Sequence, residues 1–285
     1  YSVILIAYTK SLNGFMQTGN KEGGNYQFFY HYQWKDNHMP SADYIIVDEI
    51  QDFDKEEIEE FINAAKKHFL FFGDTAQSIY RQFGKNTMTI EEISKLTNLP
   101  VLPLYNNYRL PRPVAKITQN YVGVNVSRYA DKIYRNKEKA LPHFVQFPDF
   151  TSQVQAIADI VNNNPESSVG ILLPNNKLVI DTYRELLRLD VAFEYKFQVE
   201  GIEKKTMENL NFYSNLPKLM TYHSAKGLQF DIVVLPKYEG AKSIEDRKAL
   251  YVAMTRTMHK LYVMYSTSEI MPPLNVPTLL YKKEL

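Results

Sequence analysis

Two adjacent carboxylates follow directly after a run of apolar residues in "DYIIVDEIQD" (43–52). Open parallel sheets bind ligands beyond the carboxyl ends of their strands, so Asp48 and Glu49 would point into a ligand crevice. A magnesium–nucleotide site uses one acid near the metal and a second that orients or deprotonates a water. The alternative is an acidic helix cap, which accounts for Asp54, Glu56 and Glu57. Taken alone, the stretch leaves both interpretations open.

Polar side chains suited to a nucleotide site recur after other apolar stretches. Gln77, in "FFGDTAQSIY", could hydrogen-bond a phosphate or a water. Arg109 is expected at a strand end and Arg256 at the end of an apolar helix. A single arginine of this kind is usually a surface residue, but two of them together with an acid pair favour a function. A loop between two expected strands carries His223, Ser224, Lys226 and Gly227.

The elements that would position these residues alternate between short apolar runs and helical patterns. The first part of the sequence predicts strands at 3–8, 44–48, 69–74 and 99–104. The first three are too continuously apolar for a sheet with one wet face, which indicates a covered parallel sheet. A crossover helix is predicted over 54–69, with Asp54 as N-cap and Glu57 at the capping-box position.

A second series begins near Pro111 and Pro113, where the chain is expected to leave one domain and start a helix. Two consecutive α/β domains are therefore predicted, over residues 1–110 and 111–285. The second domain should contain strands at 143–147, 168–173, 192–197, 217–223, 231–236 and 260–266, and helices near 152–162, 177–189 and 246–256. The stretches 14–38 and 199–216 give no clear prediction.

Composition limits the classes of function. Lys and Arg total 33 against 32 Asp and Glu, for a net charge of +1, so any nucleic-acid-binding surface must be local. No apolar run approaches the roughly 18 residues that cross a bilayer, and no leader features occur, so we expect a cytoplasmic protein without a membrane partner. The chain has no cysteine, which excludes disulfides and thiolate metal sites. It does not begin with Met, and we expect residues upstream.

In order and spacing, "AYTKSL", "VDEIQD", "GDTAQSIYRQFG", "NNYRL", "TYHSAKGLQFD" and "YVAMTRT" resemble motifs Ia, II, III, IV, V and VI of the UvrD/Rep-type superfamily 1 helicases. The motifs span residues 7 to 257. The resemblance implies an α/β fold of two RecA-like domains of the P-loop NTPase type with parallel sheets. The spacing leaves no room for large inserted subdomains. The resemblance also implies Mg²⁺ and ATP as cofactors, single-stranded or partly duplex DNA as partner, movement along DNA driven by ATP hydrolysis, and a role in DNA repair.

The family's catalytic roles can be carried over to matching positions. By this resemblance Asp48 is the magnesium ligand and Glu49 the catalytic base. Gln77 matches the residue that senses the γ-phosphate. Arg109 and Arg256 match two arginines that stabilise charge in the transition state.

The binding residues follow from the same resemblance. Tyr108 resembles the aromatic that stacks on adenine, and Gly227 lies in motif V. Gln229 stands where the family carries a glutamate that contacts the ribose, and an amide can still hydrogen-bond a hydroxyl. Phe83 is expected to substitute for an aromatic that is replaced by Gln82. Positions near the DNA path, where stacking and phosphate contacts act without reading sequence, are Thr9, Lys10, Tyr80, Phe83 and His223.

The largest departure from the family is that no G-x-x-x-x-G-K-[ST] occurs. "GNKEGGN" (19–25) lacks the Lys-Ser/Thr pair and is expected to be a flexible loop. Two functions remain, an ATP-driven helicase or translocase whose upstream segment has been cut away and a hydrolysis-dead nucleic-acid-binding or scaffolding relative. The acid pair and both arginines favour the first. We expect no ATP hydrolysis from this chain, lower stability, and an apolar edge beside the strand at 44–48.

Overall fold

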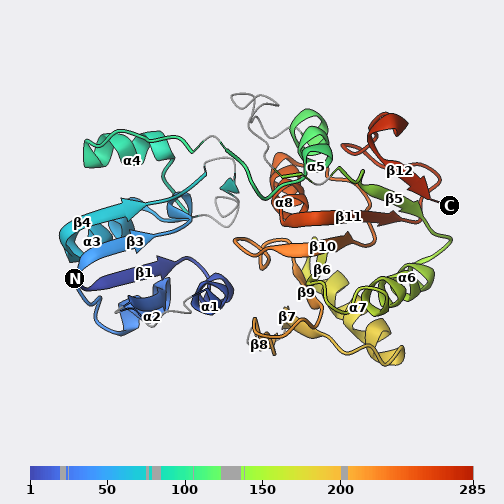
Figure 1. Cartoon of the computed structure of the whole chain (residues 1–285), viewed down its shortest axis with the longest axis horizontal. Coiled ribbons are helices and arrows are strands. Elements are labelled where there is room, and N and C mark those ends of the chain that lie inside the picture. Colours follow the sequence, from blue (N-terminus) through green and yellow to red (C-terminus); the bar gives the residue numbers. More distant parts are fainter. Residues whose placement is uncertain are drawn as a thin grey trace. The chain divides into compact units, whose positions relative to one another are not determined.

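The computed structural model describes residues 1–19, 24, 26–74, 77–78, 85–104, 106–122, 136–137, 139–199 and 205–284. The chain divides into two compact units, Tyr1–Leu104 (unit 1) and Tyr105–Leu285 (unit 2). Each unit is built on its own mainly parallel sheet with helices packed against it (Figure 1). The predicted α/β class with parallel sheets is therefore confirmed, whereas the identity of the units as RecA-like domains stays a prediction.

Unit 1 carries a four-stranded parallel sheet in the order β2-β1-β3-β4. Its strands are β1 (Val3–Ala7), β2 (Tyr26–Tyr30), β3 (Ala42–Val47) and β4 (Ala65–Phe71). Its helices are α1 (Lys10–Thr18), α2 (His31–Asp36), the 3₁₀ turn η1 (Ile50–Asp52), α3 (Lys55–Ala64) and α4 (Ile90–Thr97). The stretch 14–38, which gave no prediction, thus holds most of α1 and all of β2 and α2.

The pairing register of unit 1 sends alternate residues to opposite faces of its sheet. Ile4, Ile45 and Phe69 form one row, which packs in a buried cluster with Trp34 of α2 and Phe61 of α3. The neighbouring row consists of Phe28, Leu5, Ile46 and Leu70.

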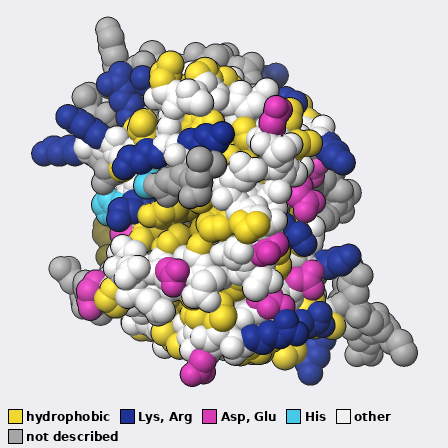
Figure 2. Space-filling model, turned by 90° about the vertical axis from the view of Figure 1, so that its right-hand side faces the viewer, with side chains coloured by type: hydrophobic (Ala, Val, Ile, Leu, Met, Phe, Trp, Pro, Cys, Tyr) yellow, Lys and Arg dark blue, Asp and Glu magenta, His cyan; other side chains and the backbone are white. Residues whose placement is uncertain are grey.

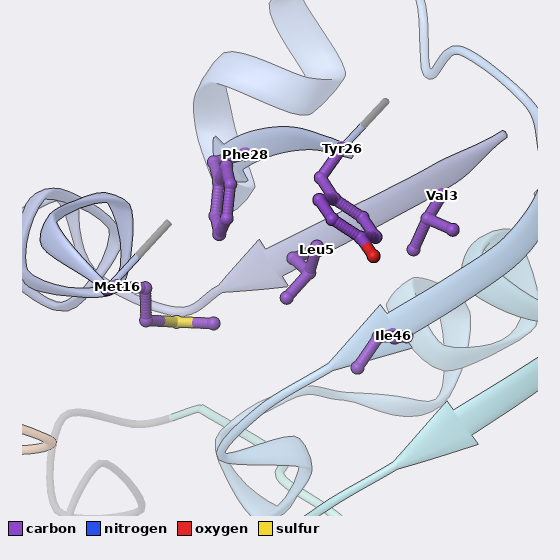
Figure 3. Close-up of a pocket in the computed structure, with 7 residues that line it drawn as sticks. Val3, Leu5, Met16, Tyr26, Phe28 and Ile46 are labelled. Carbon is purple, nitrogen blue, oxygen red and sulfur yellow. The ribbon is translucent and has the colours of Figure 1, made fainter. Parts of the chain in front are cut away.

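This second row borders an open pocket. Leu5, Phe28 and Ile46 line a pocket of about 400 Å³, with Met16 of α1 at its side (Figure 3). Leu70, at the end of the row, is 43% exposed. The second face of the sheet is therefore only partly covered by the residues that the structure describes.

The free edge of this sheet differs from the predicted one. β3 pairs with β1 on one side and with β4 on the other, so the expectation of an apolar edge beside 44–48 is wrong. The outer strand on that side is β4, beyond which no strand of the described residues pairs. β4 exposes Lys66, Lys67 and His68 as well as Leu70, and the adjoining Phe72 is also exposed.

One helix end and one strand predicted in unit 1 are also wrong. The helix predicted over 54–69 ends at Ala64, because parallel pairing with β3 draws Ala65–Phe71 into the sheet. The strand predicted over 99–104 does not form. Pro100 and Pro103 lack the N–H that a sheet ladder needs, and Leu102 and Leu104 are 81% and 84% exposed.

Unit 2 carries an eight-stranded sheet in the order β12-β5-β11-β10-β6-β9-β7-β8, parallel except for the β7–β8 pair. Its strands are β5 (His143–Gln146), β6 (Val169–Leu173), β7 (Glu194–Val199), β8 (Lys205–Glu208), β9 (Lys218–Thr221), β10 (Phe230–Leu235), β11 (Thr257–Tyr265) and β12 (Lys282–Glu284). Its helices are α5 (Arg112–Ile117) with the π-turn Thr118–Val122, α6 (Phe150–Asn162), α7 (Asn176–Arg188), α8 (Ile244–Met254) and the 3₁₀ turn Thr278–Leu280. Only β8, β12 and the 3₁₀ turn had no counterpart in the predicted series.

Helices cover both faces of the unit 2 sheet. On one face, Ile171 and Val234 pack in a buried cluster with residues of α6 and α7, such as Ile157 and Leu186. α5 and α8 lie on the other face (Figure 1), where Leu172 is fully buried. In the part of the chain that the structure describes, no helix is both long and apolar enough to span a membrane.

Candidate functional site

The two acids lie in a strained turn after β3. The Asp48 N–H donates to the Ile6 carbonyl (3.1 Å), and the Glu49 N–H donates to Asp48 Oδ1 (2.9 Å). Glu49 has a φ of +56°, a left-handed conformation that residues other than glycine rarely adopt. Such strain persists only where surrounding bonds hold it, and it concentrates at functional sites.

A line of hydrogen bonds connects Glu49 with Gln77, which follows β4. Gln51 Nε2 donates to Glu49 Oε2, and the Asp74 N–H donates to Gln51 Oε1 (2.9 Å). Gln77 Nε2 in turn donates to Asp74 Oδ2 (3.0 Å). Glu49 and Gln77 are therefore connected beyond the carboxyl ends of β3 and β4.

Sequence reasoning assigned no role to Gln51 or Asp74. Both lie inside the quoted motifs, and Gln51 is fully buried at 0% exposed. A buried amide is hydrogen-bonded as a rule, so an amide two residues after a strand-end acid could have been identified as its partner. Which second group it binds depends on tertiary contacts that the sequence does not contain.

The side chains near Asp48 suit a Mg²⁺ ion that is shared with phosphates and waters, and not a metal held by protein groups alone. Among the described residues, no group of three or more His, Asp or Glu side chains could hold a metal ion. Mg²⁺ is usually bound by one or two carboxylates together with substrate phosphates and waters. The half-buried Asp48 carboxylate, with Glu49 next in sequence, can supply that protein share.

In unit 2, Arg256 lies at the amino ends of β10 and β11, where its guanidinium group is held by oxygen atoms. Nε donates to the Val252 carbonyl (2.9 Å), Nη1 to the Leu228 carbonyl (3.4 Å) and Nη2 to Thr255 Oγ1 (3.2 Å). Arg256 is 1% exposed. These bonds fix the orientation of its charge and place it beside the loop that contains Leu228.

That loop, between β9 and β10, contains three predicted site residues. Gly227 has a φ of +80°, which a glycine adopts without steric cost, and Gln229 follows two residues later. His223 is half-buried, and burial followed by the Lys226 ammonium lowers its pKa, while Asp246 acts in the opposite direction. The imidazole therefore favours its neutral form more than an exposed histidine does.

Arg109 lies in a turn and not at a strand end, so that prediction is wrong. The segment 99–104 before it forms no strand, and Asn107 Oδ1 accepts from the N–H groups of Arg109 (3.1 Å) and Leu110 (2.9 Å). Asn136 Nδ2 donates to the carbonyls of Arg109 and Met258, the latter at 3.0 Å. This bridge joins the backbone of Arg109 to the start of β11, close to Arg256 in sequence.

The remaining predicted positions lie in unlike surroundings. Thr9 is the N-cap of α1, where its Oγ1 accepts from the Leu12 N–H (3.1 Å), and Lys10 is exposed. Tyr108 is 72% exposed, which suits a stacking residue without assigning one. Two predicted DNA-path residues, Tyr80 and Phe83, lie outside the described residues.

One face of unit 2 carries charged side chains of both signs. On the face at the right of Figure 1, Lys and Arg side chains occur around the edges with Asp and Glu among them, and hydrophobic side chains cross the middle (Figure 2). This face carries charges of both signs and no continuous field of one sign. A DNA contact would therefore depend on particular residues.

Comparison with known proteins links the C-terminal part of the chain to helicases. Residues 218–264, from β9 into β11, match the family model of the UvrD-like helicase C-terminal domain. The ATP-dependent DNA helicase PcrA of Staphylococcus aureus (strain Mu50 / ATCC 700699) is 30% identical in an alignment 146 residues long, and the match covers 35% of this chain and 20% of that protein. A probable DNA helicase II homolog of Rickettsia conorii is 31% identical in an alignment 106 residues long, and that match covers 31% of this chain and 16% of that protein.

A solved structure is also similar. It is the C-terminal domain of a possible DNA helicase from Lactobacillus plantarum WCFS1, with a TM-score of 0.44, 21% identity, and coverage of 62% of this chain and 98% of that one. The sequence relatives confirm the resemblance to UvrD-like helicases. The chain spans about a fifth of the length of the PcrA proteins that it matches.

Proposed function

Because residues 218–264 match the UvrD-like helicase C-terminal domain, we propose that this chain carries most of the core of a UvrD/Rep-type DNA helicase or translocase. Together with a phosphate-binding loop, which this sequence lacks, such a core would move on single-stranded DNA, or on DNA that is partly duplex, by hydrolysing ATP in the cytoplasm. The observation that carries the proposal is the hydrogen-bonded line from Glu49 through Gln51 and Asp74 to Gln77. This line joins two motifs that are distant in sequence, one with the proposed base Glu49 and the other with the proposed phosphate-binding amide Gln77.

Each residue has a distinct task in this proposal. Asp48 would hold Mg²⁺, which neutralises charge on the phosphates when bound. Glu49 would accept a proton from the attacking water, and Gln77 would donate a hydrogen bond to that water or to the terminal phosphate. Arg109 and Arg256 would stabilise charge that develops in the transition state.

The nucleotide and DNA contacts complete the proposal. Tyr108 would stack on the adenine, and Gly227 and Gln229 would lie near the ribose. Contacts to a single strand would come from Thr9, Lys10, Tyr80, Phe83 and His223. These contacts stack on bases or meet phosphates, so they would tolerate any sequence.

A second function is favoured by one feature of the sequence, the lack of G-x-x-x-x-G-K-[ST]. That motif supplies backbone N–H donors and a lysine to the phosphates and a hydroxyl to Mg²⁺. Without these groups, residues 1–285 would bind single-stranded DNA without turning over ATP. The chain would then act as a binding or scaffolding relative of the helicases.

Single-strand binding tests what both functions share. We expect weak binding to fluorescent oligonucleotides of any sequence, with an affinity that falls about tenfold or more between 50 and 200 mM salt, because phosphate contacts release counterions. Lys10→Ala should weaken binding and reduce the salt dependence. Lys55→Ala is the matched control, because Lys55 is an exposed helical lysine outside the predicted DNA path. Salt-independent binding or a strong preference for one sequence would contradict the proposal.

A further inference from the structure

Gln51 is a fully buried amide between the acid pair and the segment after β4. It lies in η1 and is 0% exposed. Its two ends have different partners: Nε2 donates to Glu49 Oε2, and Oε1 accepts from the Asp74 N–H. Reversing the amide would place Oε1 against a carboxylate and Nε2 against an N–H donor. The two partners therefore determine its orientation.

Gln51 packs closely against Gly73. A Cβ added at Gly73 would overlap Gln51 Oε1 and would lie 2.9 Å from Ile50 Cγ2. The backbone on both sides is tied to β3, because the Phe72 N–H donates to the Val47 carbonyl and the Ile50 N–H to the Phe72 carbonyl, both at 2.9 Å. The glycine thus permits the close approach that the amide bridge needs.

The bridge continues to Gln77 through Asp74. Gln77 donates to Asp74 twice, from its backbone N–H to the carbonyl (2.9 Å) and from Nε2 to Oδ2 (3.0 Å). At the other end, the Glu49 backbone is in the left-handed conformation, which surrounding bonds must hold in place. A displacement of the Glu49 carboxylate would therefore act on Gln77 through only two intervening residues.

We propose that Gln51 is a positioning residue that holds the Glu49 carboxylate and the Gln77 amide in a fixed relation, so that a change at one is transmitted to the other. This inference deepens the proposed function, in which Glu49 faces the water and Gln77 the terminal phosphate. Gln51 itself would touch neither the water nor the phosphate. It would keep the two groups at the spacing that a single reacting phosphate demands.

A double-mutant cycle read by NMR tests the transmission without any ligand. Glu49→Ala removes the carboxylate at one end, and the side-chain NH₂ signal of Gln77 is observed at the other. We expect a clear shift of that signal in the wild-type background and at least a fivefold smaller shift in a Gln51→Met background, where the bridge is gone. Equal shifts in the two backgrounds would overturn the proposal.

Amide hydrogen exchange provides the second readout. Gln51→Met should make the Asp74 N–H exchange about tenfold faster, since it loses its acceptor, while the Ile45 and Val47 amides in β3 keep their rates. Gln51→Asn, one methylene shorter, should give the same pattern, which guards against a defect particular to methionine. If exchange became faster throughout unit 1, or if the rate at the Asp74 N–H did not change, Gln51 would be a general core residue and the proposal would be overturned.

Gln153 in unit 2 is the matched control. It is 1% exposed, donates to Ser266 Oγ (2.7 Å) and accepts from the Lys237 N–H (2.7 Å), so it is the same kind of bridge outside the site. Gln153→Met should speed exchange at Lys237 and leave the Gln77 signal unchanged. Because neither readout uses nucleotide, a failure of ATP or DNA binding would count against the proposed function and not against the role of Gln51.

Discussion

The sheets of the two units are built alike but covered differently. In unit 2, successive residues of β6 point to opposite faces and both are buried, as Ile171 and Leu172 are 0% exposed. In unit 1, Ile45 and Ile46 of β3 differ, because Ile45 is 0% exposed and Ile46 lines the open pocket. Parallel sheets normally bury both faces. Unit 2 meets that condition within the described residues, and unit 1 meets it on one face.

This difference bears on where the proposed chemistry lies. The acid pair and Gln77 belong to unit 1, whose sheet has the open face, whereas Arg256 belongs to unit 2, whose strand β6 is buried on both faces. A half-covered sheet buries less apolar surface and therefore gains less stability from burial. We therefore expect unit 1 to be the less stable unit and its site to be the more sensitive to loss of packing.

The largest expected effect comes from substitutions on covered and open faces. Ile171→Ala removes a fully buried side chain of unit 2 and should lower the free energy of unfolding by about 2–5 kcal/mol. Leu70→Ala removes a side chain that is 43% exposed and should cost less than about 1 kcal/mol. Urea unfolding of each variant measures both. Similar losses would mean that the second face of unit 1 is covered after all.

A buried histidine makes unit 1 sensitive to acid. Burial, followed by the charges of Lys85 and Lys35, lowers the pKa of His31 to about 4, although the Glu57 carboxylate lies 3.3 Å from its Nε2. The unfolded chain takes up this proton near pH 6.5 and the folded one near pH 4. Protonation of His31 therefore leaves the free energy of unfolding unchanged above about pH 6.5. As the pH falls from there toward 4, this protonation lowers the free energy of unfolding by up to about 3 kcal/mol.

His31→Leu is the variant that isolates this effect. It keeps an apolar side chain against Phe53 and Phe61 and removes the titrating group. The difference in free energy of unfolding between wild type and variant should change between pH 7 and pH 4 in favour of the variant. An unchanged difference over that range would show that the pKa of His31 is the same in the folded and the unfolded chain.

The smaller expected effect is a separation of the two unfolding transitions. Trp34 is the single tryptophan of the chain and is fully buried in unit 1, so its fluorescence reports that unit alone. Far-UV circular dichroism reports both units. We expect the fluorescence midpoint at lower urea, by about 1 M for a stability difference of about 2 kcal/mol. Coincident midpoints would make the units equally stable or one cooperative whole.

The strand and helix start on which the acid pair depends could be predicted from local sequence. The apolar run before Asp48 gave β3, and the Asp54–Glu57 capping box at the start of α3 is present. The end of α3 could not be predicted in this way, because 65–69 has a helical pattern and only its pairing with β3 makes it a strand. The local sequence therefore predicted the start of α3 correctly. Its end is set by a tertiary contact, which the local sequence does not contain.

The places of the acid pair and Arg256 in their elements could be predicted from the sequence, and their hydrogen-bond partners could not. Asp48 and Glu49 stand out as acids after a buried strand, and Arg256 as a charge after an apolar helix. Gln51 does not stand out, because its amide acts as a bridge only when folding brings its two hydrogen-bond partners together. Arg109 was placed wrongly because the strand expected before it is interrupted by two prolines.

The central proposal is that this chain carries the acid and amide half of a nucleotide site without the phosphate-binding loop. Calorimetric titration of residues 1–285 with MgATP, together with a phosphate-release assay with and without single-stranded DNA, tests it most directly. A triphosphate carries about four negative charges, and near Asp48 and Glu49 it would meet further negative charge without a row of N–H donors and a lysine. We predict affinity weaker than micromolar and no measurable turnover. Micromolar binding with turnover stimulated by single strands would contradict the account and would reveal another phosphate site.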